Sequence, residues 1–199
     1  MKSIGMVGLL LSTGLWASAC VNRQDSANPT TPIVVEKSFG LGGHVEMQLD
    51  GGNYEIRPAA DTHIRVTLSR NVGQAKAEIT TDGTAGHVVV RDTPHHNFQA
   101  IVEVPNRTDL VVHLNGGNLL LAGITGNKVV ESTAGNTEIR VGDPNDYARV
   151  EASVKAGNID TDAFGRSTGG LFPHLSWSGP GKYSLQATLG AGNLELRRQ

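Results

Sequence analysis

Apolar and polar residues alternate with a period of two along most of the chain after Ile33. In residues 44–50, for example, Val45, Met47 and Leu49 fall on one side of an extended chain and polar residues on the other. The same alternation covers residues 63–69, 75–80, 87–91, 101–104, 109–114, 128–132, 136–141, 148–154, 183–189 and 193–197. No stretch beyond the first 20 residues shows the period of an amphipathic helix. The pattern predicts an all-β fold.

A Gly-Asn pair followed by an alternating strand recurs five times, and each pair is preceded by Gly or Ala. The pairs are Gly52 and Asn53, Gly117 and Asn118, Gly135 and Asn136, Gly157 and Asn158, and Gly192 and Asn193. The asparagines from position 118 onward follow one another at steps of 18, 22 and 35 residues. Glycine permits the positive φ of a tight corner, and stacked asparagines can form a side-chain ladder.

These intervals favour a β-solenoid over residues 109–199, in which each coil turns at a Gly-Asn corner. Residues 33–105 lack the regular interval, so we expect them to form a β-sheet region that caps or continues the stack. The alternative is a β-sandwich built of hairpins, because Gly-Asn also forms hairpin turns.

The repeated corners, together with residues 101–115, 177–183 and 190–196, resemble the bacterial "putative adhesin" domain family. The resemblance covers about residue 40 to the C-terminus and is strongest after Asp109. It implies a β-solenoid with Gly-Asn or Gly-Asp at each corner. The family has no established catalytic residues, so the resemblance predicts an architecture and assigns no reaction.

The first 20 residues are typical of an export signal. Lys2 is followed by an uncharged, largely apolar stretch that is short for a membrane span, and small residues then precede Cys20, the only cysteine. This arrangement resembles a bacterial lipoprotein signal, in which the cysteine is acylated and becomes the N-terminus. Ala17 stands where that pattern usually has Leu, so cleavage that leaves a free Cys20 thiol is the alternative. Val21 after the cysteine would favour the outer membrane of a Gram-negative cell.

The predicted organisation is therefore a signal peptide over residues 1–19, a polar flexible tether over residues 20–32 and one β domain over residues 33–199. With one cysteine, the domain contains no internal disulfide. The 17 basic and 19 acidic side chains give a formal net charge of −2, which gives no support for nucleic-acid binding.

Two carboxylates form the strongest enzymatic hypothesis. Asp160 and Asp162 lie two residues apart and would point the same way from a strand, with Asp143 and Asp146 one coil earlier. Paired carboxylates cleave polysaccharides in some enzymes and bind Ca²⁺ in other proteins. A solvated outer face explains the same residues more simply.

The other motifs give weaker signals. Residues 165–169 match the nucleophile-elbow pattern around Ser167, but no acid lies between it and the only later histidine, His174. His95 and His96 would point to opposite sides of an extended chain, which makes a poor metal clamp. Gly181 and Lys182 lack the remainder of a phosphate-binding loop. Trp177 and Tyr183 flank a turn, where an aromatic pair closing the end of the domain is favoured over a sugar-stacking platform.

The sequence thus predicts an exported, lipid-anchored envelope protein without enzymatic activity, cofactor or metal. Its β surface would contact a protein or a glycan. A polysaccharide-active enzyme and a self-assembling structural protein remain as alternatives.

Overall fold

The computed structural model describes residues 31–199, and its strands follow the alternation of apolar and polar residues. The strands are β1 (Ile33–Ser38), β2 (His44–Leu49), β3 (Gly52–Pro58), β4 (His63–Arg70), β5 (Lys76–Asp82), β6 (Ala85–Arg91), β7 (Gln99–Val104), β8 (Asp109–Leu114), β9 (Gly117–Ala122), β10 (Lys128–Val141), β11 (Tyr147–Thr161), β12 (Thr168–Leu171), β13 (His174–Ser178) and β14 (Tyr183–Arg198). A short 3₁₀ helix, η1 (Pro144–Asp146), joins β10 to β11. The predicted all-β class is confirmed.

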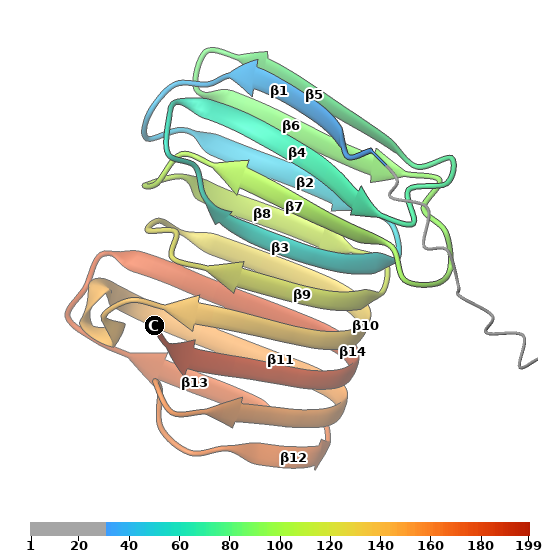
Figure 1. The fold of residues 1–199 in the computed structure, drawn as a ribbon. Helices are drawn as coiled ribbons and strands as arrows, with labels where there is room; N and C mark the ends of the chain where they lie inside the picture. The colour runs from blue at the N-terminus through green and yellow to red at the C-terminus, as the bar shows by residue number, and fades with distance from the viewer. Residues whose placement is uncertain (1–30) are drawn as a thin grey trace, which may run out of the picture.

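Two faces enclose the core, and three long strands run through both. The first half of β10 pairs with β8 and its second half pairs with β9, while β14 pairs with β10 along its whole length and with β11. The first face contains β5, β6, β2, β8, β13 and the first halves of the long strands. The second face contains β1, β4, β7, β3, β9, β12 and the second halves. Figure 1 shows the two layers and the bends that join them.

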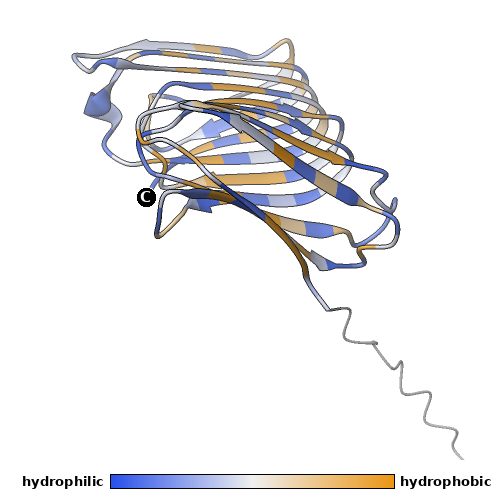
Figure 2. Cartoon of the chain, turned by 90° about the horizontal axis from the view of Figure 1, so that it is seen from above, coloured by the Kyte–Doolittle hydropathy of each residue, from blue (hydrophilic) through white to orange (hydrophobic). Residues whose placement is uncertain are grey.

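Inward-facing side chains of both faces form one continuous apolar cluster from Phe39 to Leu196. Along β4, Ile64, Val66 and Leu68 are fully buried while the residues between them are partly exposed. Figure 2 shows this alternation of apolar and polar positions along the strands. Burial of one side of every strand in the shared core is the main stabilising contribution, because about 25 cal/mol is gained per Å² of apolar surface removed from water.

The parallel passes of the chain do not stack in chain order. A pass is either a pair of strands, one on each face, or one long strand that runs through both faces. Along the stack the order of the passes is β6 with β7, β2 with β3, β8 with β9, and then the long strands β10, β14 and β11. The last strand, β14, therefore lies between β10 and β11, although β10 and β11 follow each other along the chain.

A solenoid in which each coil rests on the preceding one is thus not shown. The segment between Asn158 and Asn193 contains β12 and β13, which pair antiparallel with the outer edge of β11. With that edge covered, β14 pairs with the other edge of β11. Two packed faces around one core are compatible with the sandwich alternative, although their central strands are parallel.

Candidate functional site

The Gly-Asn corners meet in one row where the two faces join. Gly135 pairs with Gly117 on one side and with Gly192 on the other, and its φ is 122°. A Cβ atom on Gly135 would lie 1.7 Å from the carbonyl oxygen of Gly117. Adjacent strands thus approach each other so closely at the corner that there is no room for a side chain. Gly117, Gly157 and Gly192 also have positive φ and equally close neighbours, whereas a Cβ on Gly52 would meet the ring of Phe98.

The five asparagines that follow these glycines form a continuous side-chain ladder. Nδ2 of each asparagine donates to Oδ1 of the next: Asn158 to Asn193 (3.0 Å), Asn193 to Asn136 (3.0 Å), Asn136 to Asn118 (3.1 Å) and Asn118 to Asn53 (2.7 Å). Nδ2 of Asn53 ends the chain by donating to the carbonyl oxygen of Phe98 at 3.0 Å. We call this row the asparagine ladder. All its donors point the same way, so each hydrogen bond polarises the next.

Charged rows run beside the asparagine ladder on the outer surface of the second face. The residue two positions after each ladder asparagine faces outward, and four of these five residues are acidic: Glu55, Glu138, Glu195 and Asp160. Arginines two positions further on neutralise most of them. Arg140 pairs with Glu138 at 2.6 Å, and Arg197 pairs with Glu195 and Asp160 at 2.9 and 2.7 Å. The exception in the acidic row is Leu120 of β9.

Beside this interruption lies an open groove of about 470 Å³. Its lining includes three ladder asparagines (Asn53, Asn118 and Asn136), the apolar Leu120 and the carboxylates of Glu55 and Glu138. Leu119 and Leu121 are buried and Leu120 is half-buried between them, so Leu120 contributes to the outer surface. The groove therefore combines an apolar patch with amide and carboxylate groups, which is the usual composition of a ligand site.

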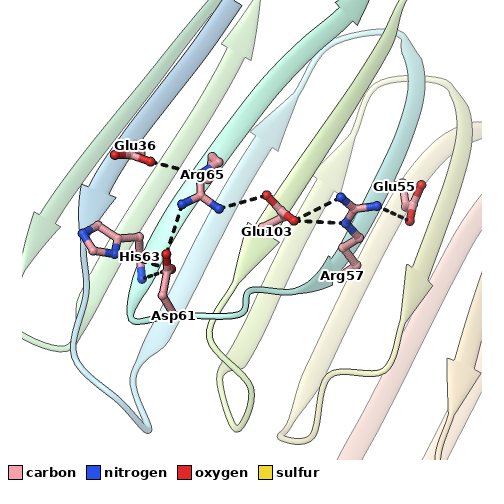
Figure 3. Close-up of polar contacts among 7 residues, drawn as sticks. All are labelled: Glu36, Glu55, Arg57, Asp61, His63, Arg65 and Glu103. Atoms are coloured by element: carbon pink, nitrogen blue, oxygen red, sulfur yellow. Dashed lines mark hydrogen bonds and ion pairs between the residues drawn. The ribbon is translucent and has the colours of Figure 1, made fainter.

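An ion-pair network extends the second face from Glu55 toward β1, as Figure 3 shows. Arg65 donates to Glu36 (3.0 Å), Asp61 (3.1 Å) and Glu103 (3.2 Å). Glu103 also accepts from Arg57, which lies 3.5 Å from Glu55. The hydrogen bonds that Arg65 donates to Glu36, Glu103 and Asp61 raise the pKa of Arg65 above its usual value. These exposed pairs contribute little stability individually. Together they hold the charged side chains in place on the outer surface beside the groove.

Three of the four carboxylates of the enzymatic hypothesis are engaged in structural contacts. Asp160 accepts hydrogen bonds from Ser167 and from Arg197, and these two contacts lower its pKa. Asp162 accepts from the backbone N–H of Arg198 at 3.0 Å, and Asp143 caps η1 by accepting from Asn145 at 2.9 Å. The structure thus gives three of the four carboxylates structural partners.

The remaining motifs also have local roles. Besides donating to Asp160, Oγ of Ser167 accepts from the backbone N–H of Thr161, and Thr168, which follows it, begins β12 instead of a helix. Ring centroids of Trp177 and Phe164 lie 5.0 Å apart, and both side chains belong to or pack against the core. Tyr183 packs beside Tyr147 at 6.4 Å. His95 and His96 lie exposed in the loop before β7.

Sequence analysis missed Lys128, which lies in the core with 1% of its surface exposed. Its Nζ donates to the carbonyl oxygen of Gly126 at 3.0 Å and to the hydroxyl of Tyr147 at 2.8 Å. Burial lowers its pKa to about 8, against the opposing effect of the Asp109 and Asp146 charges. The inward position of residue 128 in the alternation is the one signal that could have identified it.

Cys20 and the rest of the expected signal lie outside the described residues. Within residues 31–199, no helix has the length and apolar character needed to cross a membrane. The same part of the chain contains no cluster of three or more His, Cys, Asp or Glu side chains arranged to hold a metal ion.

Solved structures provide the informative comparison, since no family model and no curated protein matches the chain. A protein from Clostridium sporogenes described as a "putative cell adhesion protein" aligns with a TM-score of 0.50 and 13% identity, over 85% of this chain and 100% of that one. The resemblance is one of fold. A "putative adhesin" from Bacteroides fragilis aligns over 84% of this chain and 98% of its own, with 8% identity and a TM-score of 0.28. The predicted resemblance to the "putative adhesin" domains is confirmed at the level of fold.

Proposed function

We propose that this chain is an exported, lipid-anchored envelope protein that binds an extended ligand in the groove beside the asparagine ladder, without enzymatic turnover. The carrying observation is the groove itself, whose lining includes three asparagines of the ladder. The name of the Clostridium structure agrees with an adhesive role. Engagement of Asp160 by Arg197 and Ser167 argues for binding over hydrolysis.

The chemistry of the groove favours a neutral glycan as the ligand. Amide and carboxylate groups of Asn118, Asn136, Glu55 and Glu138 can exchange hydrogen bonds with sugar hydroxyls, and Leu120 offers an apolar contact to a ring face. The lining of the groove contains no Lys or Arg side chain, so it offers a polyanionic chain no cationic partner. Parallel strands about 4.8 Å apart repeat the same groups along the stack, which suits a ligand with a repeating unit.

The test measures binding of neutral hexose oligosaccharides, with uronic-acid oligomers for comparison, to the chain lacking residues 1–20. This form keeps every residue of the core from Phe39 to Leu196. We expect Leu120→Lys to weaken binding by about tenfold or more, because it places a long charged side chain in the groove. Val129→Lys is the matched control, since Val129 is half-buried on the first face of β10.

Equal binding by the two variants would refute the groove as the site. Capture of a protein in place of any glycan would refute the ligand class, and release of shortened oligosaccharides would refute binding without turnover.

Lipid anchoring has its own test, which is mass spectrometry of the N-terminal peptide from membrane fractions. We expect an acylated Cys20 at the mature N-terminus, and loss of membrane association in Cys20→Ser. An unmodified Cys20 in the membrane fraction would contradict the anchor and leave the groove unaffected.

A further inference from the structure

The two ends of the stack differ in how their outermost strands are protected. At the end where the chain enters the domain, β1 carries Glu36 and Lys37, and β5 carries Lys76, Glu78 and Asp82. At the other end, β12 and β13 pair only with β11, and residues 168–178 contain no Asp, Glu, Lys or Arg. Charged side chains on edge strands prevent pairing with other molecules. The β12–β13 end lacks that protection.

The bend between β12 and β13 exposes two large apolar side chains. Leu171 and Phe172 have 78% and 75% of their surface exposed. The bend is held in place by backbone hydrogen bonds from Phe172 N–H to the Lys155 carbonyl (3.0 Å) and from Val154 N–H to the Pro173 carbonyl (3.1 Å). The two apolar side chains therefore sit on an ordered support.

The backbone of Phe172 has a φ of 57°, in the left-handed region. This conformation is unfavourable for a bulky residue. Asparagine would adopt it more readily and would not expose an aromatic ring to water. Since an exposed Phe172 gains little contact within the domain, strain and exposure together indicate a role in contact with another molecule.

We propose that the β12–β13 end is a self-association surface, through which two copies of this chain pair end to end. An antiparallel pairing of β12 with β12 of the second copy would place Leu171 and Phe172 of both copies at one two-fold interface. The same segment lies on both sides of such an interface, so a net charge on it would face the same charge on the second copy; the absence of Asp, Glu, Lys and Arg from residues 168–178 avoids this repulsion.

The position of this end leaves it accessible. On the second face, β1 and β12 are the two outermost strands, so the chain enters the domain at Ile33 at the end opposite to β12 (Figure 1). An anchor attached before Ile33 would join the domain at the end away from β12. Copies held on facing surfaces could then meet through their distal ends.

Sedimentation of the chain lacking residues 1–20 over a range of concentrations tests the proposal. We expect a reversible monomer–dimer equilibrium and a dissociation constant at least about tenfold higher in Phe172→Asn. This variant should unfold at the same or a higher temperature, because it relieves the strained φ. A residue that only packs within the domain would give the opposite thermal shift. Leu41→Asn is the matched control, since Leu41 is 68% exposed in the turn between β1 and β2.

A strictly monomeric wild type at all concentrations overturns the proposal, as does a Phe172→Asn variant that dimerises as the wild type does. Glycan binding is measured separately at the groove, so failure of either proposal is distinguishable from failure of the other.

Discussion

Replacing Lys128 by methionine should change how the stability of the protein depends on pH. Lys128 occupies an inward position between Leu110 of β8 and Leu185 of β14. Its pKa is lowered from the ordinary 10.5 to about 8 because burial disfavours the charged amine. Since each pH unit of difference is worth about 1.36 kcal/mol, holding the charged form in the core costs about 3 kcal/mol below pH 8.

The sign follows from proton binding. Between pH 8 and pH 10.5 the unfolded chain keeps the Lys128 proton that the folded chain has released. The unfolded state then binds more protons, so stability rises with pH in this range. From pH 7 to pH 9.5 the wild type should gain about 2 kcal/mol relative to Lys128→Met. Tyr147, which accepts a hydrogen bond from Lys128, stays neutral in this range because burial raises its pKa.

Urea unfolding at these two pH values measures the effect in the wild type, in Lys128→Met and in the control Lys155→Met, whose lysine is exposed on β11. The control should keep the wild-type pH dependence, since its lysine has water around it in both states. Identical pH dependence in the wild type and Lys128→Met would refute the reasoning, because the buried amine would then titrate as it does in the unfolded chain.

Other predictions concern the corner, the asparagine ladder and the core. Gly135→Ala should destabilise the protein by at least about 3 kcal/mol, whereas Gly142→Ala, with no atom near the added Cβ, should be neutral in thermal unfolding. Asn118→Ala removes two ladder hydrogen bonds and Asn158→Ala removes one, so urea unfolding should show about twice the loss for the former, at roughly 1 kcal/mol per bond. Thr137→Val should stabilise by about 1 kcal/mol in the same assay, because the buried Thr137 hydroxyl has no hydrogen-bond partner; a loss of stability would contradict its isolation.

Prediction from the sequence succeeded where the determining interactions are local. The alternation of Val45, Met47 and Leu49 with polar residues is enough to predict β2, because it requires only that one side of the strand be buried. The sequence did not predict the groove. Leu120 appears in the sequence as one more apolar residue of a strand, and its place between Glu55 and Glu138 depends on the pairing of β3, β9 and β10.

The period-two pattern predicted most of the strands and the five Gly-Asn corners, but not β1, β12 or β13. A residue such as Gly135 must lack a side chain and adopt a positive φ wherever its coil lies, and Asn136 must follow it on the outer surface. Which of these segments lie side by side depends on contacts between parts of the chain that are far apart in the sequence. Five passes of the chain present the same Gly-Asn corner, so the local pattern fits any of these neighbours equally well. Because β12 and β13 cover one edge of β11, β14 pairs with the other edge. The bare edge at β12 follows from that arrangement of distant segments, which no local pattern encodes.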